Sequence, residues 1–219
     1  MAKKKQAPNL TRPSSRFEDQ AAAEGASRIA GIDEAGRGPL AGPVVAAAVV
    51  LPSYDLIPNL NDSKLLTPTQ REDLYSLIKA HAVGIGIGVA DVDEINEINI
   101  LQATRSAMCQ AVSRIRPLPD YLLIDGNIKL DMELPQLSII KGDRLSFSVA
   151  AAGIMAKVTR DKIMMELHEI FPEYGFDHHK GYGTPEHKEA ILRHGPSPVH
   201  RRFFKGVRDE LGPLFSDLV

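Results

Sequence analysis

Residues 29–38 of the chain read IAGIDEAGRG, an apolar strand that ends in two adjacent carboxylates just before a glycine loop. Removing carboxylates from water is costly unless a cation or hydrogen-bond donors satisfy them. Neighbouring side chains of a regular strand point to opposite faces. Asp33 and Glu34 can therefore serve one site only if the strand ends or bends here, which Gly36 permits. For an isolated Asp-Glu pair, a solvated strand end that caps a turn is the commoner explanation.

A second apolar strand with a similar ending favours a functional site. Residues 122–127 read LLIDGN, so Asp125 is followed directly by a glycine, and Asp143 follows the next expected strand. Carboxylates clustered at strand ends suit hard cations such as Mg²⁺, which prefer oxygen ligands and retain waters. The chain has neither paired cysteines nor a His-x-x-x-His spacing, which disfavours zinc.

The chemistry that suits four such acids is two-metal phosphodiester hydrolysis. In that reaction one ion activates and orients the attacking water while the other stabilises the leaving 3′-oxygen. The carboxylates would then be metal ligands and not general acids. A metal-free pair of carboxylates, as in glycoside hydrolysis, is the weaker alternative.

The order of the expected elements predicts an α/β sheet layered with helices. The continuous apolar run over 44–51 indicates a strand buried on both faces. Strands are expected over 27–33, 44–51, 83–90, 121–125 and 137–141. Helices are expected over 68–80, from Asp91 to before Pro117, and over 146–170, 185–194 and 197–212. The helix that opens at Asp91 is expected to bury a stripe of Ile98, Leu101, Met108, Val112 and Ile115.

Length and composition fit one compact domain over 27–206, with two domains as the weaker possibility. Residues 1–26 are rich in Lys, Pro, Ser, Ala and Gln and predict a disordered tail, and 207–219 a final helix or tail. Cys109 is the only cysteine, which excludes an intramolecular disulfide. No apolar stretch follows the N-terminal lysines, and the longest apolar run is too short for a bilayer. A cytoplasmic protein without membrane contact is therefore expected.

Basic residues are concentrated near the C-terminus, although the formal net charge of the whole chain is −2. The segment 178–208 carries seven Lys or Arg against two Glu, together with five of the seven histidines. Such a local excess of positive charge could face phosphates. A solvated helix face explains the same pattern equally well.

Seven motifs, in order along residues 28–206, resemble bacterial ribonuclease HII. Two of them are longer than six residues, and all occur in family order, which makes the resemblance specific. The motifs are 31–44 (GIDEAGRGPLAGPV), 61–64 (NDSK), 99–104 (NILQAT), 125–127 (DGN), 156–161 (AKVTRD), 179–187 (HKGYGTPEH) and 198–203 (PVHRRF). The resemblance implies a ribonuclease H-like fold, with a mixed five-stranded sheet flanked by helices and a small C-terminal helical part.

The resemblance also implies an endonuclease that hydrolyses the RNA strand of RNA–DNA hybrids and cuts 5′ of ribonucleotides embedded in duplex DNA. Its products would carry 3′-hydroxyl and 5′-phosphate ends, and its cofactor would be Mg²⁺ or Mn²⁺ in a two-metal site. Asp161 is a rival ligand, but its basic helical surroundings better suit an ion pair with Lys157 or Arg160. The residues that match the family's metal-binding acids are Asp33, Glu34, Asp125 and Asp143.

Two loops match the family's substrate contacts. The loop Gly36-Arg37-Gly38 matches the one that recognises the ribose, and glycines do let a backbone approach a 2′-hydroxyl closely. Tyr182, between two glycines, matches the tyrosine that stacks on the sugar beside the RNA-to-DNA junction. Because phosphate contacts position a duplex without reading its bases, little base preference is expected. Candidate phosphate contacts are Lys64 and Lys180 and, more weakly, Arg201 and Arg202.

One departure and two alternatives remain open. Gly153 stands in a helix where the family usually has serine, which puts local packing or substrate contacts in doubt. An exonuclease of the same broad fold would typically carry Asp-x-Glu on its first strand, whereas Asp33 and Glu34 are adjacent. A non-catalytic nucleic-acid-binding module built on 178–208 would have no use for buried acids facing a phosphate chain. The oligomeric state is not encoded in these patterns, and a monomer is the default expectation.

Overall fold

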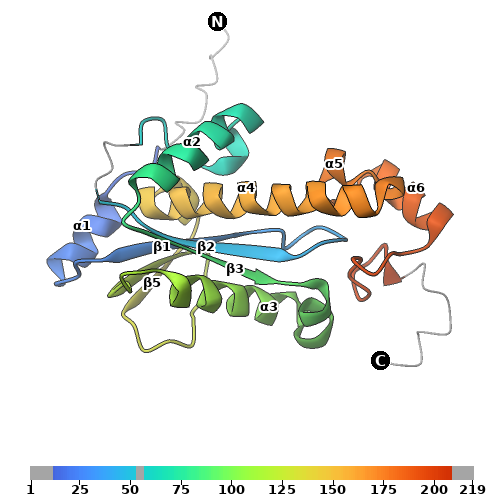
Figure 1. The fold of residues 1–219 in the computed structure, drawn as a ribbon. Coiled ribbons are helices and arrows are strands. Elements are labelled where there is room, and N and C mark those ends of the chain that lie inside the picture. Colours follow the sequence, from blue (N-terminus) through green and yellow to red (C-terminus); the bar gives the residue numbers. More distant parts are fainter. Residues whose placement is uncertain (1–11, 53–56, 209–219) are drawn as a thin grey trace, which may run out of the picture.

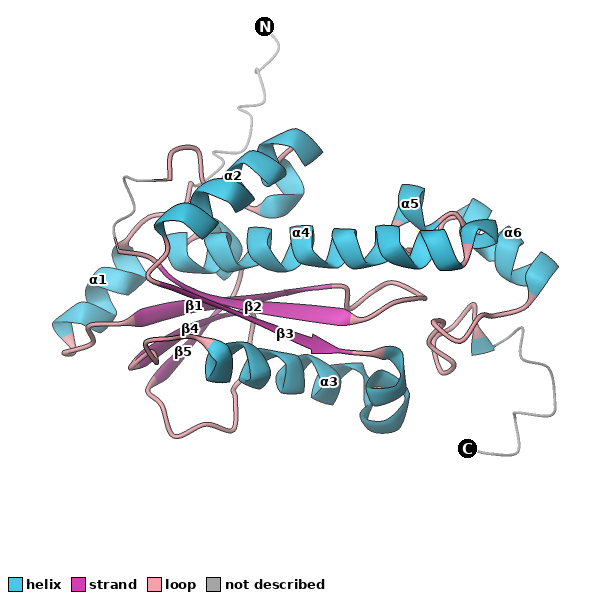
Figure 2. Cartoon of the chain, in the orientation of Figure 1, coloured by secondary structure: helices cyan, strands magenta, loops and turns pink. Residues whose placement is uncertain are grey.

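The computed structural model describes residues 12–52 and 57–208, and it contains a mixed five-stranded sheet (Figures 1 and 2). The strand order is β3-β2-β1-β4-β5, in which β1, β2 and β3 pair antiparallel while β4 and β5 run parallel to β1. The strands are β1 (Ile29–Ala35), β2 (Val44–Val50), β3 (Gly84–Ala90), β4 (Tyr121–Asp125) and β5 (Gln136–Ile139). The predicted fold class is therefore confirmed.

Helices cover both faces of the sheet, as Figure 1 shows. The long helix α4 lies on one face with α2 packed beside it, and α3 lies on the other. Two short helices, α5 and α6, follow α4 and form a C-terminal layer. The helices are α1 (Arg16–Ala23), α2 (Pro68–His81), α3 (Val92–Arg114), α4 (Phe147–Ile170), α5 (Phe176–His179) and α6 (Pro185–His194).

The interior strand β2 is buried along its whole length, as its continuous apolar sequence predicts. The edge strand β3 instead carries alternating glycines. A Cβ at Gly86 or Gly88 would overlap a backbone carbonyl of α3. The glycines therefore let α3 approach the sheet more closely than a strand with side chains on that face would allow.

An N-terminal helix corrects the predicted disordered tail. Helix α1 lies within residues 1–26 and is tied to the start of α4 by the buried side chain of Glu18. One Glu18 carboxylate oxygen accepts hydrogen bonds from Ser146 Oγ at 2.7 Å and from the Ser148 amide at 2.9 Å. An acid at a helix N-terminus is electrostatically favourable. The short helix lacks a strong sequence signal, because its partner lies about 130 residues away. Residues 1–11 lie outside the described part.

Helix α3 is kinked, which corrects part of its predicted apolar stripe. Asn99 has φ +67° inside the helix, and its side chain accepts hydrogen bonds from the amides of Leu101 and Gln102. The stripe is buried after the kink, at Met108, Val112 and Ile115. Ile98 is exposed, because it precedes the kink, which breaks the helical periodicity that relates it to the later residues. Leu101, in the first turn after the kink, is exposed as well.

The helix predicted over 197–212 is wrong for its described part, since residues 197–208 form turns and one isolated bridge. The bridge pairs His200 with Ala41, and the Arg201 amide donates to the Leu40 carbonyl at 2.8 Å. Tertiary hydrogen bonds to the loop after β1 thus replace helical ones. The end of that prediction, over 209–212, lies outside the described residues. None of the described helices is long and apolar enough to cross a membrane.

Candidate active site

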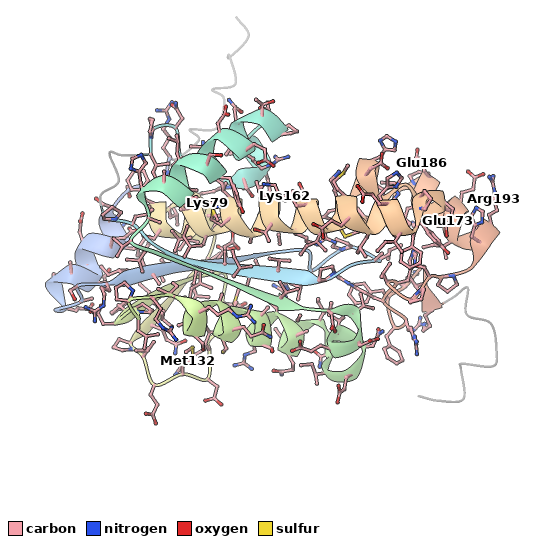
Figure 3. The ribbon with its side chains drawn as sticks, viewed as in Figure 1. Lys79, Met132, Lys162, Glu173, Glu186 and Arg193 are labelled. Atoms are coloured by element: carbon pink, nitrogen blue, oxygen red, sulfur yellow. The ribbon has the colours of Figure 1, made fainter. Side chains whose placement is uncertain are left out.

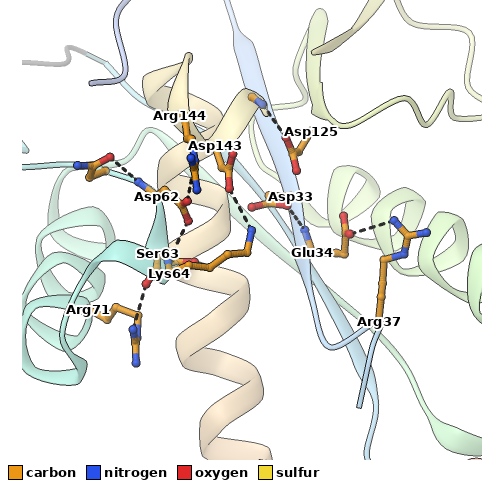
Figure 4. Close-up of polar contacts among 12 residues, drawn as sticks. Asp33, Glu34, Arg37, Asp62, Ser63, Lys64, Arg71, Asp125, Asp143 and Arg144 are labelled. Carbon is orange, nitrogen blue, oxygen red and sulfur yellow. Dashed lines mark hydrogen bonds and ion pairs between the residues drawn. The ribbon is translucent and has the colours of Figure 1, made fainter. Parts of the chain in front are cut away.

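Three aspartates from separate parts of the chain meet on the α4 face of the sheet (Figure 4). Asp33 lies near the end of β1, Asp125 ends β4, and Asp143 lies in a 3₁₀ turn, Gly142–Arg144, between β5 and α4. Because β1 and β4 run parallel, their carboxyl ends reach the same edge of the sheet. One carboxylate oxygen from each aspartate lies within 4.8 Å of the others.

Glu34 lies on the opposite face of the strand from Asp33. The strand continues to Ala35 without the expected end or bend, and Glu34 pairs with Ala46, whose side chain belongs to the core beneath α3. One Glu34 oxygen lies 3.5 Å from the Arg37 guanidinium, and the other is buried without a hydrogen-bond partner among the described residues. The structure therefore brings three of the four predicted acids together, and leaves the fourth beside them with an unsatisfied oxygen.

The acids repel one another in a poorly hydrated site. Burial raises the pKa of Asp33 well above its usual value, and the neighbouring Glu34 and Asp125 carboxylates raise it further. The pKa of Glu34 is raised by burial, against the lowering effect of Arg37, and the pKa of Asp125 is raised by burial and by Asp143. An all-oxygen set of buried, mutually repelling carboxylates fits a divalent cation, which would relieve the repulsion and the buried orphan oxygen.

Lys64 is the one lysine that forms an ion pair with this aspartate group in the described structure, with Nζ 3.1 Å from Asp143 Oδ2 (Figure 4). Its backbone is held by Asp62, whose buried carboxylate accepts from the Lys64 amide at 2.9 Å and from Arg144 Nε at 3.0 Å. The Lys64 side chain itself is mostly exposed. Lys64 is therefore anchored at its backbone and free to reorient at its tip.

Gly153 of α4 faces Asp33 directly. A Cβ at position 153 would overlap the Asp33 carboxylate, so the departure from serine lies against the candidate metal centre itself. Gly153 therefore lies against the candidate metal ligand Asp33 and does not only contribute to the packing of α4. Nothing in the sequence around Gly153 signals the contact, because it joins residues 120 positions apart through the packing of α4 on β1.

The two predicted substrate loops lie side by side although they are about 145 residues apart. The Leu40 amide donates to the Gly181 carbonyl at 2.8 Å. A Cβ at Gly38 would lie 3.9 Å from the Tyr182 ring, which is 46% exposed. Gly36 has φ +99°, and any side chain there would overlap Arg160, so glycine is required at that position. The glycine loop and Tyr182 therefore form one continuous surface that begins directly after Asp33 and Glu34.

Behind these loops lies a group of buried nitrogen-bearing side chains, here called the arginine–histidine cluster: Arg160, Arg201, His187 and His200. Arg201 was predicted as a weak phosphate contact, which is wrong, because it is fully buried and donates only to backbone carbonyls. Burial lowers the pKa of Arg201 to about 9, which leaves it charged at neutral pH.

The two histidines form a directed chain of hydrogen bonds that ends on Tyr182. The Ser197 amide donates to His200 Nδ1 at 2.9 Å, the two histidine Nε2 atoms lie 3.0 Å apart, and His187 Nδ1 lies 2.8 Å from the Tyr182 carbonyl. A carbonyl can only accept, so His187 carries its proton on Nδ1 and accepts at Nε2 from His200. Both rings are therefore neutral. Burial lowers the pKa of His187 to about 4 and that of His200 to about 3.

Three of the seven basic residues in the segment 178–208 have partners within the protein. Arg201 is buried, the Lys180 ammonium donates to the Asp177 carbonyl, and Arg193 forms a surface ion pair with Glu189 at 2.8 Å. Figure 3 shows Arg193 at the outer end of α6, away from the sheet. The rival acid Asp161 pairs with Lys157 at 2.7 Å, as expected from its helical surroundings.

The sheet order and its helical layers define a ribonuclease H-like fold, and solved structures share it. The ribonuclease H2 from Pyrococcus horikoshii OT3 superposes with a TM-score of 0.70 at 29% identity, covering 84% of this chain and 96% of that chain. Residues 30–207 match the family model of ribonuclease HII. The chain therefore belongs to the ribonuclease HII family of enzymes, as the motifs in its sequence indicate.

Curated relatives agree with that assignment over almost the whole chain. The ribonuclease HII of Geobacter sulfurreducens is 56% identical over 196 residues, which cover 90% of each protein. That of Geobacillus kaustophilus is also 56% identical over 196 residues, which cover 90% of this chain and 75% of the relative.

Proposed function

We propose that this protein cuts the RNA strand of RNA–DNA hybrids, and cuts 5′ of ribonucleotides embedded in duplex DNA, leaving 3′-hydroxyl and 5′-phosphate ends. The observation that carries the proposal is the convergence of three aspartates within 4.8 Å, one of which, Asp33, lies just before the loop Gly36-Arg37-Gly38. Membership of the ribonuclease HII family supports the choice of substrate.

In this proposal Asp33, Asp125 and Asp143 would hold divalent cations, Mg²⁺ or Mn²⁺. Glu34 is the fourth expected ligand, although it lies outside this group on the opposite face of β1, and its candidacy rests on its buried oxygen without a hydrogen-bond partner among the described residues. Such ions supply an activated water and stabilise the charge on the leaving oxygen. The carboxylates themselves would bind the cations and fix their positions. Burial first, and repulsion from neighbouring acids second, raises the pKa values of Asp33, Glu34 and Asp125, and bound cations would offset that repulsion.

The remaining residues position the nucleic acid. The backbone of Gly36-Arg37-Gly38 reads the 2′-hydroxyl, and the exposed Tyr182 ring stacks on the neighbouring sugar. Lys64 and Lys180 are the candidate phosphate contacts, although each ammonium already has a partner in the protein, Asp143 for Lys64 and the Asp177 carbonyl for Lys180. Because none of these contacts requires a base edge, cleavage should follow the sugar and not the sequence.

The test is cleavage of a labelled DNA duplex that contains one ribonucleotide, with Mg²⁺ or Mn²⁺ and with EDTA and all-DNA controls. A single metal-dependent cut 5′ of the ribonucleotide is expected. Degradation of a continuous RNA–DNA hybrid alone would restrict the proposal to hybrids. An end-labelled substrate shortened only from its terminus would indicate an exonuclease. Binding of either substrate without cleavage would overturn the enzymatic proposal.

A further inference from the structure

Two buried guanidinium groups donate hydrogen bonds to the backbone of the loop over 36–43 from the protein interior. Arg201 donates to the carbonyls of Gly36 at 2.6 Å, Arg37 at 3.0 Å and Gly42 at 2.8 and 3.0 Å. Arg160 donates to the carbonyls of Ala41 and Pro43 at 3.1 and 3.0 Å. The two side chains therefore bind most of the carbonyls along this loop.

Neither guanidinium forms an ion pair with a carboxylate in the described part of the chain. A buried charge is costly without compensation, and here converging backbone dipoles supply it. Only the planar, five-donor fork of arginine can bind several carbonyls in fixed directions, since a lysine offers one point charge. These directed hydrogen bonds indicate that the two arginines fix the backbone conformation of the loop and do not only fill space in the core.

The carbonyl groups and the amide groups of the loop consequently have different surroundings. Its carbonyls at Gly36 and Arg37 face the protein, whereas no described residue accepts a hydrogen bond from the amides of Arg37 or Gly38. Those two amides are the donors left for a ligand hydroxyl. Arg160 also binds the loop that carries Tyr182. Its guanidinium donates to the Lys180 carbonyl at 3.0 Å and lies 6.0 Å from the Tyr182 ring centroid.

We propose that Arg201 and Arg160 are positioning residues that set the selectivity for a ribonucleotide. They fix the amides of the glycine loop and the Tyr182 loop in one geometry around the 2′-hydroxyl. Neither residue contacts the substrate. This inference rests on the proposed function, because it concerns how that reaction selects its sugar.

The test compares Arg201→Lys and Arg160→Lys, which keep the charge and lose the fork. Arg105→Lys is the matched control, because Arg105 also binds one backbone carbonyl, that of Lys129, with bonds of 2.6 and 3.1 Å on the α3 side of the sheet. Single-turnover kcat/KM is measured on two duplexes that differ only in carrying a 2′-hydroxyl or a 2′-fluorine at one nucleotide. Mn²⁺ binding by calorimetry and Tm are measured alongside.

The ratio of the two kcat/KM values should fall roughly 10–100-fold in Arg201→Lys, the effect of a misplacement on the order of 1 Å, and less in Arg160→Lys. Mn²⁺ affinity should stay that of the wild type, and Arg105→Lys should behave as the wild type throughout. A folded Arg201→Lys with unchanged selectivity would overturn the inference, as would a parallel loss of Mn²⁺ binding. Failure of both variants to fold would also overturn it, because the arginines would then support the whole domain. A wild type that cuts neither duplex would instead refute the proposed function.

Discussion

The carboxylate centre (Asp33, Glu34, Asp125 and Asp143) and the arginine–histidine cluster both bury ionisable groups, yet they are satisfied in different ways. The centre places like charges together, has Lys64 and Arg37 as nearby cations and leaves one Glu34 oxygen without a hydrogen-bond partner among the described residues. Within residues 12–52 and 57–208 the cluster has no carboxylate partner, but its guanidinium groups and imidazoles find hydrogen-bond partners within the protein. The carboxylate centre therefore needs a bound cation to balance its charges, whereas the groups of the arginine–histidine cluster are already hydrogen-bonded in the folded protein.

Burial is the main cause of the pKa shifts in both regions, but its consequences are opposite. In the centre it raises the pKa of Asp33, and neighbouring acids raise it further, so charge accumulates only at a cost that a cation can offset. In the cluster it lowers the pKa of His187 to about 4 and keeps the ring neutral, as its hydrogen-bond chain requires. A group of buried acids that repel one another therefore indicates a cation-binding site. A buried group whose hydrogen bonds are satisfied within the protein indicates a structural role.

The largest expected effect is the loss of activity in Asp33→Asn. The amide keeps the acceptor for the Glu34 backbone N–H, now at 2.7 Å, but loses the charge that a cation needs. kcat/KM should fall by more than the roughly 10–100-fold typical of outer ligand contacts. The metal-free variant should also be more stable than the wild type, by on the order of 1 kcal/mol, because one repelling charge is removed.

Cleavage assays with Mg²⁺ and thermal unfolding in EDTA measure the two effects together. Asp161→Asn is the control, since it removes an acid that is paired with Lys157 outside the centre. Full activity in Asp33→Asn at physiological Mg²⁺ would show that Asp33 is not a ligand. A less stable metal-free variant would show that the acids do not repel one another.

The pH dependence of stability should separate the two regions next. The pKa values of His187 and His200 lie at about 4 and 3 in the folded protein, below the ordinary value of 6.5. As pH falls from 6.5 toward 4, the unfolded chain takes up protons that the folded one does not, so the free energy of unfolding decreases. Asp33, with a raised pKa, has the opposite effect as pH falls toward ordinary carboxyl values.

Comparing the wild type with His187→Gln in EDTA isolates the histidine contribution, because the carboxylate centre is common to both proteins. Their difference in the free energy of unfolding should shrink as pH falls below 6.5, since the variant lacks one of the groups that must stay neutral. His81→Gln, at the exposed end of α2, controls for the loss of an imidazole. A difference that does not vary with pH would contradict the neutral chain.

The smallest expected effect is that of Lys64→Gln. Its side chain is mostly exposed, so the ion pair with Asp143 should contribute no more than about 1 kcal/mol to stability. If Lys64 contacts a phosphate, the slope of log affinity against log salt concentration should become shallower by about 0.9. Titrations of a labelled hybrid in EDTA at several salt concentrations measure this. Lys162→Gln, which breaks a surface pair with Glu72, is the control, and equal slopes in all three proteins would exclude the contact.

Short-range patterns in the sequence predicted most of the sheet and its helices. Strand β2 and the capping box of α2, with Thr67 and Gln70 bonded to each other's amides, appear where local rules place them. Helix α1 and the turns over 197–208 do not, because each depends on partners far along the chain. The kink at Asn99 was not predicted either, although the hydrogen bonds of the Asn99 side chain are local. Local propensity is a weak guide wherever tertiary hydrogen bonds compete with it.

The sequence by itself determined that acids stand at the ends of β1 and β4 and that a glycine loop follows the first of them. Only the tertiary structure decided that Asp143 joins Asp33, that Gly153 abuts the Asp33 carboxylate, and that Arg201 faces backbone carbonyls and not phosphate. The physical reason is that residue type fixes charge and hydrogen-bonding capacity, whereas the packing of α4 and the C-terminal layer on the sheet fixes which groups satisfy them.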